Sequence, residues 1–220
     1  MVCLFVFDLD GTLIDSKGIH AKAFLETVKK YFGKNVDEER TIKIIKENFG
    51  RPGRYISKLL IDTFGLKITP NEFMKKKAEV FSGMLNKLKL FPCVEELLSY
   101  LKSRNQLLVI ASYSRIDEVR MILNNFKIRK YFDLIYGFDE SSNVTKEEFI
   151  SKLRIFLKDN VEKFFIIDDF HEMLVKAREY GYIPIGVLTG KSSREDFIRN
   201  DIKFFENLCE LQEYLKNVIE

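Results

Sequence analysis

The stretch VCLFVFDLDGTLI, residues 2–14, decides the fold because a purely apolar run ends abruptly in two acids. The run from Val2 to Phe7 contains no polar residue, which is typical of a strand buried on both faces. Asp8 and Asp10 follow it directly, and buried carboxylates are costly unless a cation or a reaction uses them. In an open α/β sheet, ligands bind at the carboxyl ends of the strands. The stretch therefore predicts a buried strand that delivers two acids to a functional site.

The composition fits a globular protein with a sizeable core. The chain has 220 residues, 46% of them hydrophobic, which suffices for one domain or a domain with a modest insert. The net charge of +3 comes from nearly balanced basic and acidic residues, so it gives no argument for a nucleic-acid or membrane partner. The first apolar run is too short for a signal peptide, and no run approaches the ~20 apolar residues of a membrane span. We expect neither a nucleic-acid nor a membrane partner.

The three cysteines, Cys3, Cys93 and Cys209, are odd in number and show no CxxC spacing. Such a set argues against a disulfide framework and fits a reducing compartment. We therefore expect free thiols, two of them as small core residues, and a cytoplasmic location.

Residues 16–89 read as an all-helical block. Apolar residues recur at helical spacing, and the segment Gly50–Gly53 interrupts them. The segment Thr69–Glu72 is a helix start, with Thr as N-cap, Pro at the first helical position and Glu at the third. No strand pattern occurs in this block. We predict a helical cap domain over 16–89, inserted into a core domain formed by 1–15 and 90–220.

From residue 90 onward, strand and helix patterns alternate, which predicts a parallel sheet with right-handed crossovers. Ser114 with Asp117, and Thr145 with Glu148, fit helix-starting capping boxes. Pro184 in one strand pattern suggests a place near the sheet edge. The fold class expected is α/β, a Rossmann-like core with helices on both faces of the sheet. The strands are expected at 107–110, 134–137, 164–167, 183–188 and 203–205.

Polar residues also end two of the later strands: Ser112, and the pair Asp168 and Asp169. In a parallel sheet these ends lie at the same edge as Asp8 and Asp10. Clustered carboxylates favour a hard cation such as Mg²⁺, and a carboxylate can act as a nucleophile in phosphoryl transfer. Lys146, at a helix start, and Ser112 would neutralise the phosphate oxygens.

These motifs, in this order, resemble those of the haloacid dehalogenase-like (HAD) hydrolase superfamily. FDLDGTL resembles its first motif, DxDxT, and the later motifs correspond to Ser112, Lys146 and the acids of FFIIDD. The helical insert resembles the cap of the phosphoglycolate phosphatase-like and beta-phosphoglucomutase-like branch. The double acid differs from the Gly-Asp often found in relatives, and Glu147 replaces a frequent Pro after the lysine.

The resemblance implies a role for each motif residue. Asp8 would attack phosphorus, and Asp10 would protonate the leaving oxygen and then activate water. Asp8, the Asp10 backbone carbonyl and Asp169 would hold Mg²⁺, with Asp168 as helper. Ser112, Lys146, Tyr113 and Gly11 would bind phosphate. Arg51 and Arg54, beside the break at Gly50–Gly53, would reach an anionic group of the substrate from the cap, and a solvated loop is the alternative for them. His20 is a further cap candidate, with a surface or supporting position as the alternative.

The leading hypothesis is a magnesium-dependent phosphatase that hydrolyses a small phosphorylated metabolite through an aspartyl-phosphate intermediate. A phosphomutase of the beta-phosphoglucomutase type is the first alternative. The second is a non-catalytic binding or regulatory protein that keeps the fold, although none of the motif residues is lost. Dehalogenation is disfavoured because it gives Asp10 neither a metal nor a proton role. The oligomeric state expected is a monomer or homodimer.

Overall fold

The computed structural model describes residues 2–33, 36–139, 142, 144–157 and 159–219. The chain divides into two compact units, one formed by Met1–Asp15 with Lys89–Glu220, the other by Ser16–Leu88. The chain leaves the first unit after strand β2 (Ile14–Asp15) and returns at β3 (Lys89–Leu90). These two strands pair in antiparallel fashion, so the insertion begins and ends at one short ladder.

The larger unit is built on a six-stranded sheet in the order β5-β4-β1-β6-β7-β8, which is parallel at every pairing. β1 lies at the centre between β4 and β6, and all five of its side chains are buried. This position explains why the strand has no polar residue. The expected parallel α/β fold is confirmed. The strands are β1 Cys3–Phe7, β4 Leu107–Arg115, β5 Leu134–Phe138, β6 Lys163–Asp168, β7 Ile183–Val187 and β8 Lys203–Phe205.

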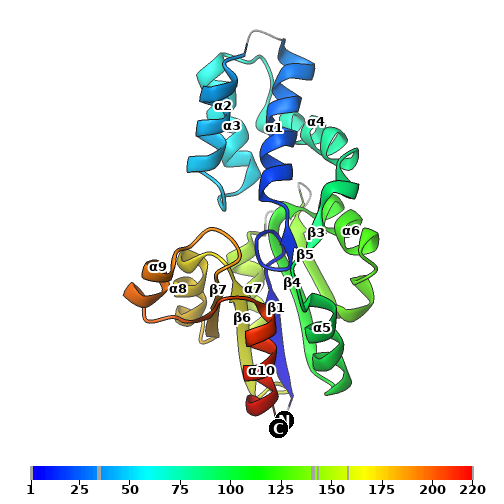
Figure 1. The fold of residues 1–220 in the computed structure, drawn as a ribbon, viewed down its shortest axis with the longest axis vertical. Helices are drawn as coiled ribbons and strands as arrows, with labels where there is room; N and C mark the ends of the chain where they lie inside the picture. Colours follow the sequence, from blue (N-terminus) through cyan, green and yellow to red (C-terminus); the bar gives the residue numbers. More distant parts are fainter. Residues whose placement is uncertain (1, 34–35, 140–141, 143, 158, 220) are drawn as a thin grey trace. The chain divides into compact units, whose positions relative to one another are not determined.

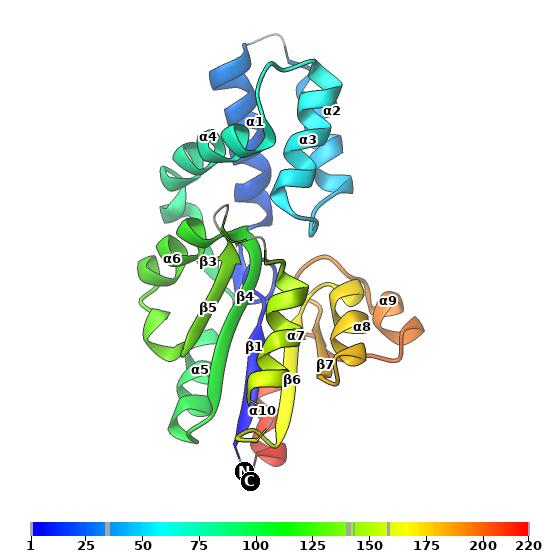
Figure 2. The same ribbon diagram turned by 180° about the vertical axis from the view of Figure 1, so that it is seen from behind.

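Helices cover both faces of this sheet. Helices α5 and α10 lie over one face (Figure 1), and α7 and α8 lie over the other (Figure 2). Phe5 and Phe165 stack across β1 and β6 with ring centroids 4.8 Å apart. The helices of this unit are α5 Val94–Ser103, α6 Ile116–Asn125, α7 Lys146–Leu157, α8 His171–Glu179, α9 Arg194–Arg199 and α10 Leu208–Val218, with a 3-10 turn at Arg129–Tyr131.

The register of the sheet aligns the ends of its central strands. Phe7 pairs with Ile110 of β4 and with Ile167 of β6. The residues that follow these three positions therefore emerge at one edge. Asp8 extends the ladder, since its backbone N–H donates to the Ile167 carbonyl at 2.9 Å.

The smaller unit is a helical domain with an apolar core of its own. Buried residues from all four of its helices form this core, including Phe24, Ile45, Leu60 and Phe73. Thr69 forms the expected capping box at the start of the fourth helix. The helices are α1 Lys17–Phe32, α2 Glu38–Glu47, α3 Gly53–Phe64 and α4 Pro70–Ser82, followed by a 3-10 turn at Leu85–Lys87. In the part of the chain that the structure describes, no helix of either unit is long and apolar enough to cross a membrane.

One helix start differs from the sequence expectation. β4 continues to Arg115, which pairs with Phe138 of β5, so Ser114 belongs to the strand. Arg115 is the N-cap of α6, and its side chain makes no capping hydrogen bond. The predicted Ser114–Asp117 capping box was therefore wrong, because strand pairing extends four residues beyond the apolar run that ends at Ala111.

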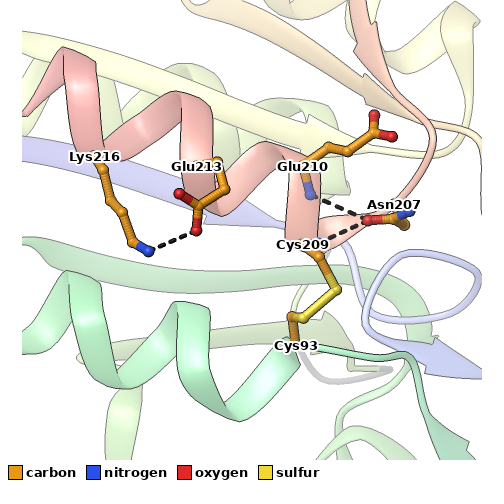
Figure 3. Close-up of a disulfide and its surroundings, with 6 residues drawn as sticks. All are labelled: Cys93, Asn207, Cys209, Glu210, Glu213 and Lys216. Atoms are coloured by element: carbon orange, nitrogen blue, oxygen red, sulfur yellow. Dashed lines mark hydrogen bonds and ion pairs between the residues drawn. A yellow bond between two sulfur atoms is a disulfide. The ribbon is translucent and has the colours of Figure 1, made fainter.

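The expectation of three free thiols was also wrong. Cys93 and Cys209 form a disulfide, with Cα atoms 5.2 Å apart, and Cys3 is a buried free cysteine. Figure 3 shows the disulfide joining the start of α5 to the first turn of α10, next to the N-cap Asn207. An odd count excludes complete pairing but not a single pair. The two cysteines are 116 positions apart, and only the packing of α10 beside α5 brings them together.

Candidate active site

Asp8 and Lys146 form the centre of the site. The Lys146 Nζ atom lies 2.6 Å from Asp8 Oδ1 and 3.0 Å from Asp168 Oδ2. Lys146 is the first residue of α7, and Thr145 with Glu148 fixes this helix start through reciprocal hydrogen bonds of 2.9 and 3.1 Å. The predicted capping box at this position is confirmed, and it places the lysine over the ends of β1 and β6.

The ammonium group of Lys146 remains charged in this setting. Burial alone would lower the pKa of Lys146, but the carboxylates of Asp168 and Asp8 outweigh it and raise the pKa above its usual value. The side chain is only 2% exposed. A permanent positive charge therefore faces the proposed nucleophile.

Asp8, Asp168 and Asp169 form a group that could hold a metal ion, with one oxygen from each within 4.8 Å of the others. All three are buried. When all are ionised they carry three negative charges against the single positive charge of Lys146. These four side chains then carry a net charge of −2, which a divalent cation with oxygen ligands would balance.

The raised pKa values of Asp8 and Asp169 also indicate that the cluster lacks positive charge. Burial raises the pKa of Asp8 well above its ordinary value, against the opposing effect of Lys146. Burial, followed by repulsion from Asp168, raises the pKa of Asp169 to about 7. Without a cation, Asp8 and Asp169 therefore favour their protonated forms. The residues fit Mg²⁺, because a hard dication would hold them ionised.

The two acids that end β6 have different partners. Asp168 accepts hydrogen bonds from the Phe170 backbone N–H at 2.9 Å and from Lys146. Asp169 accepts from the Thr12 hydroxyl at 3.2 Å and from the Lys191 backbone N–H at 2.6 Å. Asp168 thus faces the lysine, and Asp169 lies between the first motif and the loop after β7. That Asp169 is the direct ligand remains a prediction.

Asp10 lies beside two serines of β4. Ser114 Oγ donates to Asp10 Oδ2 at 2.7 Å, and Ser112 Oγ lies 3.4 Å from the same oxygen. The Ser114 backbone N–H in turn donates to Ser112 Oγ at 3.0 Å. Ser114 was not among the predicted site residues. Its signal was the alternation Ser112-Tyr113-Ser114, which in an extended strand puts both serines on one face.

Tyr113 and Gly11, both predicted to bind phosphate, lie next to residues of the site. The Tyr113 hydroxyl donates to Glu147 Oε1 at 2.7 Å, and its ring lies 4.9 Å from Lys146 Nζ. Burial, with smaller effects from Glu147, raises the pKa of Tyr113 above its usual value. Gly11 has φ +91° and packs against the Asp169 carboxylate. Both contact the site residues, and their contact with phosphate remains a prediction.

The cap candidates belong to the helical unit. His20 is buried, stacks on Phe81 with centroids 4.5 Å apart, and places Nδ1 2.9 Å from Lys77 Nζ. Arg51 is exposed, with its guanidinium 5.4 Å from the centre of the Tyr55 ring. Arg54 is exposed as well. Their roles toward a substrate remain predictions.

The acids and the buried lysine lie at the carboxyl ends of the central strands of a parallel α/β sheet, the edge at which proteins of this fold class bind ligands. A sequence model of the haloacid dehalogenase-like hydrolases matches residues 5–153, which is more than half of the chain. The chain therefore belongs to the haloacid dehalogenase-like hydrolase family, as its motifs predicted.

Individual relatives agree with this assignment. The pyrophosphatase PpaX of Oceanobacillus iheyensis is 28% identical over 215 residues, covering 90% of this chain and 92% of the relative. A phosphorylated carbohydrates phosphatase of Thermotoga maritima is 29% identical over 144 residues, covering 63% and 62%. The beta-phosphoglucomutase of Clostridium difficile has the same fold, with a TM-score of 0.75, 19% identity and coverage of 100% and 97%.

Proposed function

We propose that this hydrolase is a magnesium-dependent phosphatase acting on small phosphorylated metabolites. The observation that carries the proposal is the buried group of Asp8, Asp168 and Lys146, joined by contacts of 2.6 and 3.0 Å. A carboxylate nucleophile held against a permanent cation, within a cluster that still lacks two positive charges, suits the transfer of an anionic phosphoryl group.

Each side chain has a defined task in this proposal. Asp8 attacks phosphorus with one carboxylate oxygen, which forms an aspartyl phosphate. Lys146 holds the Asp8 carboxylate in place and stabilises negative charge on the phosphoryl oxygens. Bound Mg²⁺ would neutralise the charge shared by the acids and the phosphoryl group. Asp8 and Asp169 would hold it, with Asp168 orienting Lys146.

Asp10 transfers the protons of both half-reactions. Its carboxyl group gives a proton to the leaving oxygen in the first step and takes one from water in the second. Ser114 and Ser112 hold its Oδ2 atom, so the carboxyl plane keeps one orientation through both steps. An acid that acts twice at one reaction centre benefits from such fixed orientation.

The substrate class follows from the relatives and not from the geometry. The named relatives act on pyrophosphate and on phosphorylated carbohydrates, according to their names. We infer a small phosphate ester or anhydride for this chain. The phosphomutase alternative predicts conversion of glucose-1-phosphate to glucose-6-phosphate in place of net phosphate release, and one assay of both products separates the two.

Magnesium-dependent release of p-nitrophenol from p-nitrophenyl phosphate tests the proposal. We expect Asp8→Asn to abolish turnover, because the amide cannot form the acyl phosphate. Asp10→Asn should slow it by about 10²- to 10⁴-fold, the usual contribution of a general acid–base. Asp159→Asn, at an exposed aspartate of the same unit, should behave as wild type. Wild-type protein with no magnesium-dependent turnover of any phosphorylated compound would overturn the proposal.

A further inference from the structure

The loop after β7, residues 188–193, closes over the side chain of Asp169. The Lys191 backbone N–H donates to Asp169 Oδ2 at 2.6 Å, and the Ser192 backbone N–H donates to the Asp169 carbonyl at 3.0 Å. On the other side, the Thr12 hydroxyl donates to Asp169 Oδ1 at 3.2 Å. Both carboxylate oxygens are thus held by groups from segments far apart in the sequence.

Two glycines make this close approach possible. A Cβ atom at Gly190 would lie 1.8 Å from Asp169 Oδ2, a distance at which something must shift. A Cβ atom at Gly11 would lie 2.7 Å from the same oxygen. The Asp169 carboxylate therefore lies between the backbones of Gly11 and Gly190, and a side chain at either position would displace it.

The two stretches are also joined to each other. The Thr189 hydroxyl donates to the Gly11 carbonyl at 2.6 Å. This bond connects the loop after β7 to the loop that carries Asp8 and Asp10. The distance between the two glycines, and hence the space left for the Asp169 carboxylate, depends on it.

We propose that Thr189, Gly190 and the Lys191 backbone form a clamp that positions Asp169 for cation binding. The inference rests on the proposed function in so far as the acid cluster takes a divalent cation. A ligand held in its binding orientation before the metal arrives loses little entropy on binding, and contacts behind metal ligands are worth about 10- to 100-fold in metal affinity. The three clamp residues are positioning residues and need not touch substrate.

Cation affinity measured without substrate tests the clamp. Mn²⁺ serves as probe, and electron paramagnetic resonance counts the free ion at equilibrium. We expect Gly190→Ala to weaken Mn²⁺ binding about tenfold or more, because its methyl group occupies the place of Asp169 Oδ2. Gly18→Ala is the matched control, since a Cβ atom there meets nothing within 4 Å. It should bind Mn²⁺ as wild type does.

A second pair of variants covers the case in which Gly190→Ala does not fold. Thr189 is half-buried, so its replacement is tolerated more easily. Thr189→Val removes the bond to the Gly11 carbonyl and should weaken Mn²⁺ binding about tenfold, whereas Thr189→Ser keeps the hydroxyl and should restore it. A role confined to stability would change the melting temperature of Thr189→Val and leave its Mn²⁺ affinity unaltered.

The outcomes separate the two proposals. Wild-type protein that binds no Mn²⁺ would overturn the cation site and the clamp together. Wild-type protein that binds Mn²⁺, with folded Gly190→Ala or Thr189→Val binding it equally well, would overturn the clamp alone. Selective loss in these two variants, with recovery in Thr189→Ser, supports the clamp.

Discussion

Lys146 Nζ lies between Asp8 Oδ1 and Asp168 Oδ2, at 2.6 and 3.0 Å, and joins the ends of β1 and β6. The three side chains are almost fully buried, so their charges are poorly screened. Lys146 therefore both stabilises the folded state and takes part in the proposed reaction. Removing it would leave two buried carboxylates facing each other without a cation.

Replacing Lys146 with Met keeps the length of the side chain and removes its charge. We expect a loss of about 3–5 kcal/mol in the free energy of unfolding of the metal-free protein, because breaking a buried pair leaves an uncompensated charge. The rate constant kcat should fall by about 10²- to 10³-fold. Urea denaturation and steady-state kinetics measure the two effects.

Lys176→Met is the matched control for this variant. Lys176 is exposed and forms an ion pair at 3.2 Å with the half-buried Glu147, and pairs with a solvent-exposed lysine are worth about 1 kcal/mol or less. We expect little change in stability or kcat. If Lys146→Met is no more damaging than Lys176→Met, the central role of the buried lysine is wrong.

Ser114→Ala removes the 2.7 Å hydrogen bond to Asp10. We expect kcat to fall about 10- to 100-fold, because a hydrogen bond to a charged group is worth about 1.5–3 kcal/mol, with KM nearly unchanged. Ser114→Thr keeps the hydroxyl and should recover most of the rate. Ser103→Ala serves as control, since Ser103 is exposed and its hydroxyl donates to the Tyr100 carbonyl of its own helix. A KM effect without a kcat effect would contradict the positioning of Asp10.

The sequence predicted the sheet well because its strong signals were local. The apolar run before Asp8 and the capping boxes at Thr69 and Thr145 each need only a few neighbouring residues, and all three appear in the structure. The predicted length of β4 was too short because the last residues of this strand are polar. Its pairing with β5 is set by tertiary contacts. Short elements such as α9 lack enough residues for a clear periodicity.

The candidate site was predictable in its acids and lysine, because buried charges have few alternative explanations. The structure brings Asp8, Lys146, Asp168 and Asp169 together at one edge of the sheet. The contacts around them were not predictable. The proposed clamp on Asp169 consists of Thr189, Gly190 and the Lys191 backbone, and threonine and glycine are common in any turn. The disulfide between Cys93 and Cys209 was not predicted because no local sequence pattern indicates a pairing across 116 positions.

Reducing the disulfide between Cys93 and Cys209 should destabilise the core unit without abolishing its fold. The bond closes a loop across 116 positions, so it restricts the unfolded chain strongly. We expect a loss of about 2–4 kcal/mol in the free energy of unfolding. Urea denaturation with and without reductant measures it. The double variant Cys93→Ser, Cys209→Ser should unfold at one urea concentration in both conditions.

Counting thiols gives an independent check on the same bond. Protein unfolded without reductant should expose a single reactive thiol, that of Cys3, and reduced protein should expose all three. Three thiols in protein that was never reduced would show that Cys93 and Cys209 are adjacent but unlinked in solution.

Stability of the metal-free protein should fall as the pH rises from about 4 to about 7. Burial raises the pKa of Asp169 from 3.8 to about 7, so within this window the folded state keeps a proton that the unfolded state has released. Each pH unit within this window then lowers the free energy of unfolding. Asp8, whose pKa is raised too, acts in the same direction.

Mg²⁺ replaces these protons, so it should raise the melting temperature strongly at about pH 8 and little at about pH 5. Calorimetry in chelator and in Mg²⁺ at both pH values measures the difference. Asp169→Asn removes one of the two titrating groups and should reduce the pH dependence, leaving the part due to Asp8. An equal Mg²⁺ effect at both pH values in wild type would contradict the assignment of Asp169 to the cation site.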